Sequence, residues 1–102
     1  MMERLSKTQA TTALETLQDW RLSDDGCSIS HTFTFDNFAH AFGFMARCAL
    51  KAEEIGHHPD WTNSYNRVEV TLSTHDAGGL TDKDFELASA MDNLAEREGT
   101  LR

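Results

Sequence analysis

The chain has few of the residues that interrupt or crosslink a fold. Its 102 residues include one proline, Pro59, and two cysteines, Cys27 and Cys48. No linker rich in proline or glycine, no repeat and no low-complexity tract divides it. We therefore expect one domain over residues 1–102, a length typical of a single domain. The cysteines lie far apart and form no Cys-x-x-Cys pair, which favours two reduced, packed side chains over a disulfide.

The sequence also lacks a long apolar segment and a surplus of basic charge. Its longest apolar stretch, 41–45, is far shorter than the ~20 residues that span a bilayer. Residues 1–15 contain no apolar region of a secretory signal. Lys and Arg total 9 against 17 Asp and Glu, a formal charge of −8, which disfavours direct binding to nucleic acid or to an anionic membrane. We expect a cytoplasmic protein that binds a small molecule or another protein surface.

Capping patterns predict the first and the last helix. Ser6 with Gln9 is a capping-box pattern, and apolar residues at helical spacing then predict a helix over 7–19. Thr81 with Asp84 is a second cap pair and predicts the start of a C-terminal helix. We expect the core face of that helix to consist of Phe85, Ala88, Met91, Leu94 and Ala95.

A longer helix is predicted in the middle of the chain. Asp36 is its natural N-cap, and Gly56 followed by Pro59 ends it. Its apolar residues occupy two sides of the helix. We expect the main core stripe to consist of Phe38, Phe42, Met45, Ala46, Ala49 and Leu50, with Phe44 and Cys48 on the second side.

Alternating residues predict four strands in two hairpins. The first pair is 20–23 and 27–35, joined by an Asp-Asp-Gly turn, and the second pair is 61–65 and 68–72. The order α-β-β-α-β-β-α predicts an α+β fold, in which a four-stranded antiparallel sheet has its helices packed on one face. So small a sheet leaves edges and a face that an oligomer can extend or cover.

Three histidines lie where the second hairpin starts and ends. His57 and His58 follow the helix stop, with Glu53 one turn before the first of them and Pro59 directly after. His75 follows the last strand. Because a hairpin places its two ends side by side, we expect the three imidazoles at one end of the sheet. Imidazole is the usual acid and base near neutral pH.

Two other interpretations of these histidines stay open at this point. They can be solvated loop residues, since a His-His dipeptide is not a specific signature. They can also ligate zinc, although the sequence has no His-x-x-x-His spacing, so we expect no metal. The other two histidines are interpreted as structural: His31 as a hydrogen-bonded, partly buried residue and His40 as an exposed one.

These residues belong to a longer pattern: Glu53-x-x-x-His57-His58-Pro59-x-Trp61, Asn63-x-Tyr65-Asn66-x-Val68, Leu72-Ser73-Thr74-His75 and Gly79-Leu80-Thr81-x-x-Asp84. Upstream are Trp20 and Phe38-x-x-Ala41-Phe42-Gly43-Phe44-Met45. From Leu5 onward the sequence resembles the pterin-4a-carbinolamine dehydratases, also known as dimerization cofactors of a homeodomain transcription factor. As a set these motifs are highly specific.

The resemblance implies an enzyme that removes water from 4a-hydroxytetrahydrobiopterin to give quinonoid dihydrobiopterin, in tetrahydrobiopterin recycling for aromatic amino acid hydroxylation. It implies no metal and no organic cofactor. It also implies a homodimer formed by joining sheets, or a homotetramer formed through helices. A transcription factor or a hydroxylase is a further candidate partner, and in an animal the nucleus is a further location. The alternatives are a non-enzymatic dimerization cofactor or coactivator, and a role in molybdopterin metabolism.

By the same resemblance, His57 and His75 are the main acid–base candidates, and His58 assists or positions. Glu53 is expected to orient the first histidine or to bond the pterin. The implied substrate-binding residues are Glu53, Pro59, Trp61, Ser73, Thr74, Asp76, Ala77, Trp20 and Asp84. Two positions depart from the family: Gly56 replaces an Asp often found before the histidine pair, and Ala77 stands where the family can have Cys.

Overall fold

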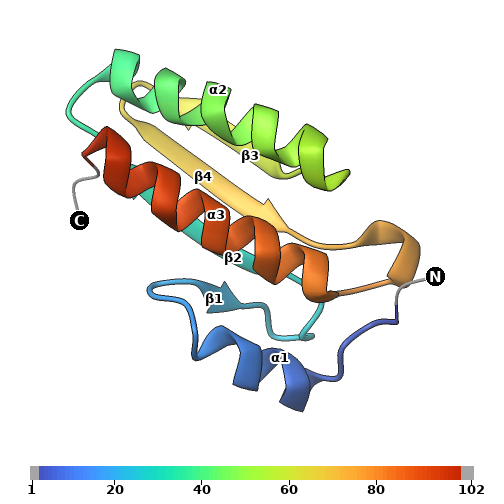
Figure 1. Cartoon of the computed structure of the whole chain (residues 1–102). Coiled ribbons are helices and arrows are strands. Elements are labelled where there is room, and N and C mark those ends of the chain that lie inside the picture. The colour runs from blue at the N-terminus through green and yellow to red at the C-terminus, as the bar shows by residue number, and fades with distance from the viewer. Residues whose placement is uncertain (1–2, 100–102) are drawn as a thin grey trace.

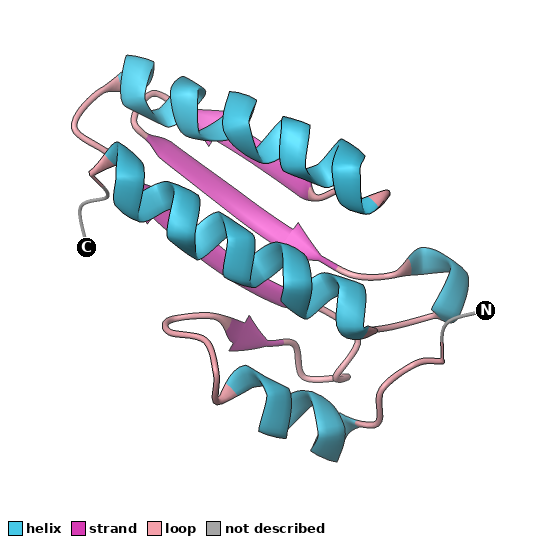
Figure 2. Ribbon diagram, in the orientation of Figure 1, coloured by secondary structure: helices cyan, strands magenta, loops and turns pink. Residues whose placement is uncertain are grey.

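Helices α2 and α3 lie across one face of a four-stranded sheet, and α1 lies beside β1 (Figures 1 and 2). The computed structural model describes residues 3–99. The elements are α1 (Lys7–Leu14), β1 (Arg21–Leu22), β2 (Ile29–Thr34), α2 (Phe38–Ile55), β3 (Asp60–Ser64), β4 (Arg67–Leu72), the short 3-10 helix η1 (His75–Ala77) and α3 (Asp82–Glu98). This order confirms the predicted α+β fold.

The strands follow the order β1-β2-β4-β3, and every neighbouring pair is antiparallel. All of β2 pairs with β4, from Ile29 opposite Leu72 to Thr34 opposite Arg67. In contrast, β1 pairs only with Ile29 and Ser30, so within residues 3–99 the rest of β2 has β4 as its one neighbour in the sheet. The hairpin between β3 and β4 brings the start of β3 to the end of β4, as the sequence predicted.

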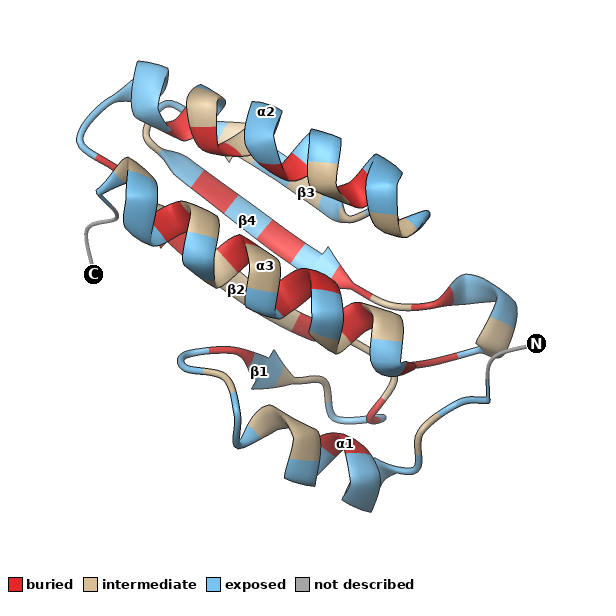
Figure 3. Ribbon diagram, viewed as in Figure 1, coloured by how far each residue is buried: buried red, intermediate tan, exposed pale blue. Residues whose placement is uncertain are grey.

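The core lies between the sheet and the two long helices (Figure 3). The predicted alternation is confirmed in β4, where Val68, Val70 and Leu72 are buried and the residues between them are exposed. The strand β2 contributes Ile29 and Phe33 in the same way. From α3, the buried apolar residues are Leu87, Ala88, Met91 and Ala95, so Phe85 and Leu94 lie at the margin of the core rather than inside it.

The predicted core stripe of α2 is wrong. The buried residues are those of the second side, Ala41, Phe44, Cys48 and Ala52. Most of the predicted stripe faces solvent: Phe38 is 49%, Phe42 57% and Leu50 75% exposed. Both sides are apolar, so periodicity could not distinguish them, and packing against the sheet decided which one is buried. We call the exposed residues Phe38, Phe42, Ala46, Ala49 and Leu50 the α2 stripe.

Two predicted helix boundaries also need correction. The first helix ends at Leu14, not near residue 19, and turns follow it. The N-cap of α2 is Asn37, not Asp36, because the Asn37 side chain accepts a hydrogen bond from the His40 N–H at 2.9 Å. Asx side chains at neighbouring positions compete for this role, and the sequence alone favours neither.

Both cysteines are free thiols, as predicted. Cys48 is fully buried in the core, and burial raises its pKa to about 12. Cys27 is half-buried and lies 3.1 Å from a guanidinium nitrogen of Arg4. Within residues 3–99, no helix has both the length and the apolar content needed to cross a membrane.

Candidate functional site

The chain turns sharply inward between α2 and β3, and this turn places His57. Gly56 adopts a left-handed conformation with φ of +75° and ends the helix. The N–H of Gly56 and that of His57 both reach the Ala52 carbonyl, at 2.9 and 3.0 Å. A glycine takes this conformation without strain, so the departure from Asp at this position is compatible with the turn. His57 is consequently buried, with 8% of its surface exposed.

The His57 ring is bound to a buried carboxylate. Its Nε2 lies 2.5 Å from Oδ1 of Asp84, a side chain with no exposed surface. The other oxygen, Oδ2, accepts from the Thr81 backbone N–H at 2.9 Å and from the Thr74 hydroxyl at 2.8 Å. Thr74 and Thr81 also share a hydrogen bond of 2.8 Å. This network joins the end of α2, the end of β4 and the start of α3, so it fixes the orientation of one imidazole.

His58 has a different carboxylate partner. Its Nε2 lies 2.7 Å from Oε2 of Glu53, and both side chains are largely exposed. The expectation that Glu53 orients the first histidine is therefore wrong. Glu53 contacts the second histidine, and Asp84 orients the first. Pro59 keeps residue 58 out of helical geometry, which explains why this ring points back along α2 rather than into the core.

His75 begins η1 and lies near the start of β3. Its Nε2 is 3.6 Å from Oδ2 of Asp60, with both side chains well exposed. The β3–β4 register accounts for this approach, because Asp60 is paired with Thr71 near the end of β4. Each of the three imidazoles thus has a carboxylate of its own at the same end of the sheet.

This arrangement suits proton transfer. A carboxylate that accepts from Nε2–H leaves Nδ1 as an acceptor in the neutral ring and as a donor in the protonated ring. Within residues 3–99, no group of three or more His, Cys, Asp and Glu side chains is arranged to hold a metal ion. The three contacts between imidazoles and carboxylates are the observation that points to acid–base chemistry.

Most of the other predicted site residues lie within four residues of one of the three histidines along the chain. Ser73 donates a hydrogen bond of 2.8 Å to the Cys27 carbonyl, and Thr74 belongs to the Asp84 network. Asp76 and Ala77 complete η1. Pro59 and Trp61 are half-buried at the start of β3, where Trp61 packs against the core.

Trp20 lies elsewhere. Its Nε1–H donates to Oδ1 of Asp92 at 2.9 Å, two turns along α3 from Asp84. Its ring packs against His31 and Phe33, with centroid distances of 5.3 and 5.9 Å. The structure therefore places Trp20 with the half-buried His31, not with the three imidazoles.

Two residues of this region were missed from the sequence. Asp60 directly follows Pro59 and directly precedes the predicted strand 61–65, and this position was a usable signal; in the structure it is the first residue of β3. Lys83 donates from Nζ to the Ile55 carbonyl at 3.2 Å and so ties the start of α3 to the end of α2. Nothing in the local pattern around Lys83 indicated this contact, because it depends on how the two helices pack.

Comparisons with known proteins identify the family of the chain. Residues 3–94 match the family described as pterin 4 alpha carbinolamine dehydratase. The chain belongs to the pterin-4a-carbinolamine dehydratase family. A Rhizobium johnstonii protein provisionally named pterin-4-alpha-carbinolamine dehydratase is 57% identical over 96 residues, which is 94% of this chain and 95% of the relative. A similarly named Afipia carboxidovorans protein is 52% identical over 99 residues, 97% of this chain and 99% of that protein.

Solved structures extend the comparison. A Brucella melitensis protein described as a transcriptional coactivator/pterin dehydratase superposes with a TM-score of 0.88 and 44% identity, covering 91% of this chain and 99% of that one. A pterin dehydratase-like protein described as a RuBisCO assembly factor in the alpha-carboxysome has a TM-score of 0.66 and 25% identity. It covers 76% of this chain and 90% of that one. The fold thus also occurs in a protein whose described role is assembly.

Proposed function

We propose that the protein dehydrates 4a-hydroxytetrahydrobiopterin to quinonoid dihydrobiopterin and water. The observation that carries this proposal is the set of three imidazoles at one end of the sheet, each beside a carboxylate, with His57 fixed to the buried Asp84. Family membership supplies the substrate class. Within this proposal the reaction recycles tetrahydrobiopterin for aromatic amino acid hydroxylation in the cytoplasm.

The reaction needs one acid and one base. The C4a–O bond breaks and the hydroxyl leaves as water after it receives a proton, while N5 loses its proton and forms a double bond to C4a. We assign the base to His57, because the Asp84 oxygen that accepts from Nε2–H leaves Nδ1 to accept the N5 proton. We assign the acid to the exposed His75, and His58 with Glu53 positions the pterin beside them.

The decisive test is a dehydration assay that follows the absorbance of the 4a-hydroxypterin. We expect His57→Ala and His75→Ala each to lower kcat by about a hundredfold or more, the usual contribution of an acid or a base. His40→Ala is the matched control, because His40 is exposed at the start of α2 and contacts Glu98. A wild-type rate equal to the uncatalysed one would contradict the proposal.

We further propose that the chain works as a homodimer or homotetramer. The edge strand β3 has β4 as its one neighbour in the sheet, and the α2 stripe exposes three large apolar residues. Figure 1 shows β3 running beneath α2, so one interface can extend the sheet and cover the stripe together. Burying Phe38, Phe42 and Leu50 removes apolar surface from water, the main driving force of association.

Light scattering during size exclusion tests this assembly. We expect Phe42→Asp to shift the protein to a smaller species, whereas Thr8→Asp, which adds the same charge on the exposed side of α1, leaves the mass unchanged. A wild-type monomer at micromolar concentration would contradict the proposal.

The α2 stripe also motivates the second candidate function, a coactivator or assembly partner without enzymatic activity. That candidate predicts partner binding that survives His57→Ala.

A further inference from the structure

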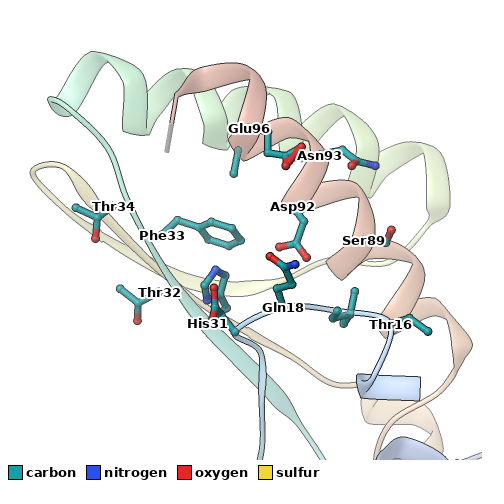
Figure 4. Close-up of a pocket in the computed structure, with 13 residues that line it drawn as sticks. Thr16, Gln18, His31, Thr32, Phe33, Thr34, Ser89, Asp92, Asn93 and Glu96 are labelled. Atoms are coloured by element: carbon teal, nitrogen blue, oxygen red, sulfur yellow. The ribbon is translucent and has the colours of Figure 1, made fainter. Parts of the chain in front are cut away.

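A cavity formed by described residues lies away from the three imidazoles. It has a volume of about 530 Å³ and is bounded by the open half of β2, the C-terminal half of α3 and the segment that follows α1 (Figure 4). We call it the β2 cavity. Four consecutive residues of β2, 31–34, line it, although their side chains alternate between the two faces of the sheet. A surface lined by consecutive strand residues is a strand edge.

Strand pairing sets the direction of the backbone hydrogen-bonding groups along this edge. The Ser23 N–H donates to the Ser28 carbonyl at 2.9 Å, so the even-numbered residues of this strand direct their backbone groups towards β1. β1 pairs with β2 only as far as Ser30. By the same alternation, the backbone N–H and C=O groups of Thr32 and Thr34 point outward from the open edge of β2, towards the side on which β1 lies.

The gap beside this edge is created by the chain itself. Continued pairing would place Asp19 opposite Thr32, two residues beyond the pair between Arg21 and Ser30. Asp19 instead adopts a left-handed backbone with φ of +67°, which turns the chain out of the line of the sheet. Leu17 and Asp19, on this side of the turn, also line the cavity. The slot therefore lies where a continuation of β1 would have been.

The carboxylates and the aromatic ring that line the β2 cavity lie among neutral side chains, and Arg21 lines a smaller cavity beside it on the same strand edge. Asp19, Asp92 and Glu96 line the cavity, and no lysine or arginine is among its described lining residues. Figure 4 shows Phe33 and His31 on the α3 side of the strand, where Asp92 also points. Trp20, which bonds Asp92, packs against both rings. Such a surface fits a basic side chain, whose apolar stem lies on aromatic rings while its charged end meets carboxylates.

We propose that the open half of β2 binds an extended basic segment of another polypeptide by strand addition, with one arginine or lysine side chain in the β2 cavity. The backbone of Thr32 and Thr34 supplies the sheet hydrogen bonds, and the carboxylates supply the charge complementarity. Unpaired strand edges recruit strands readily, and the acidic cavity restricts which strands fit. This site is separate from the proposed dehydratase site and does not depend on it.

A defined peptide tests the proposal. The probe is an acetylated and amidated hexapeptide, Thr-Arg-Val-Arg-Thr-Val, and the control peptide has Glu in place of each Arg. Binding is followed by NMR on the full chain, with the Trp20 indole N–H and the backbone amides of Thr32 and Thr34 as reporters. We expect saturable shifts of these signals with the basic peptide at low ionic strength and none with the acidic one.

Two kinds of variant separate the contributions. Thr32→Pro removes one outward N–H and should weaken binding about tenfold, whereas Thr32→Val keeps that N–H and should bind like the wild type. The pair of changes Asp92→Asn and Glu96→Gln should weaken it about fivefold, and the new amide still accepts from Trp20. If Thr32→Pro fails to fold, the double variant Asp92→Asn, Glu96→Gln provides the test of the proposal.

Three binding results would each overturn the proposal. These are no saturable shift at millimolar basic peptide, equal binding of the acidic peptide, and unchanged binding after both carboxylates are neutralised. A change of oligomeric mass in Thr32→Pro would also overturn it, because a second copy of the chain would then occupy this edge. Dehydration activity should be the same in wild type and Thr32→Pro, so failure here is distinguishable from failure of the proposed enzyme.

Discussion

The three imidazole–carboxylate pairs lie in two different environments, and the contrast indicates how the site divides its tasks. The pair between His57 and Asp84 is buried, and its carboxylate is held by two further hydrogen bonds. The pairs between His58 and Glu53 and between His75 and Asp60 are largely exposed to water. A buried charge needs all its partners, whereas a solvated pair contributes little and moves freely. One ring is therefore fixed, and in the proposed dehydratase the other two can adjust to the substrate.

The strongest test of this contrast is removal of the buried carboxylate. We expect Asp84→Ala to lower the free energy of unfolding by about 3–5 kcal/mol, because it leaves the His57 ring and the Thr81 N–H without their buried partner. Asp84→Asn keeps the shape but not the charge and should lower kcat by about a hundredfold. Thermal unfolding and the dehydration assay measure the two effects.

The neighbouring Asp82 provides the matched control. It is also in the first turn of α3, but it is exposed. Asp82→Asn should change stability and kcat only slightly. Equal losses in the two Asn variants would mean that helix capping charge, not the contact with His57, explains the effect of Asp84.

A second buried group extends the contrast to pH. Burial raises the pKa of Cys48 from 9.0 to about 12. As the pH rises, the thiol ionises in the unfolded chain before it ionises in the folded protein. The stability that Cys48 contributes as a neutral thiol is therefore complete below pH 9 and is lost as the pH rises from 9 towards 12. Its slope is at most about 1.4 kcal/mol per pH unit. Urea unfolding between pH 8 and pH 10.5 should show a shallower decline for Cys48→Ala than for the wild type.

The half-buried Cys27 is the internal comparison for that experiment. A native-state alkylating reagent should modify Cys27 first, and Cys48 only as the protein unfolds. The Cys27→Ser variant should keep the steep alkaline decline of the wild type. If it instead loses that decline, the titrating thiol is not the buried one.

Among the exposed pairs, Glu53 should show an intermediate effect. Glu53→Gln keeps a hydrogen-bond acceptor for His58, so we expect kcat to fall by less than about tenfold and stability to change by less than about 0.5 kcal/mol. Glu54→Gln is the control, because Glu54 pairs with Lys51 at 2.8 Å instead of with a histidine. Initial-rate kinetics would refute the contrast if Glu53→Gln were as damaging as Asp84→Asn.

The smallest effect is expected at Asp60. Its distance of 3.6 Å from His75 Nε2 and the exposure of both groups make the attraction weak and screened by salt. Asp60→Asn should lower kcat by about twofold at low ionic strength, and 0.5 M NaCl should remove most of the difference. A pH–rate profile measured at both salt concentrations tests this, and a difference that persists in salt would point to a more direct role.

The sequence predicted where helices and strands lie along the chain better than it predicted which side of each helix is buried. Alternation in β2 and β4 and the two cap pairs gave the correct strands and helix starts, because these signals are local. The α2 stripe was assigned to the core because both sides of that helix are apolar. In the site, the hairpin argument correctly brought the three histidines to one end, but it did not assign their partners. Trp20 was assigned to the same site as His57, His58 and His75, but its ring packs against a different histidine, His31. Only the structure shows this.

The sequence by itself therefore determined the α+β order, the family and the residues available for proton transfer, because each depends on residue types at fixed spacing along the chain. The tertiary structure alone decided which carboxylate meets which imidazole, which side of α2 faces solvent, and where β2 is left with an open edge. These features depend on side chains far apart in sequence and on competition for one buried surface. Composition, with its 9 basic and 17 acidic residues, predicted an acidic surface. Only the tertiary structure, with its turn at Asp19, shows where acidic groups line a cavity beside an open strand edge.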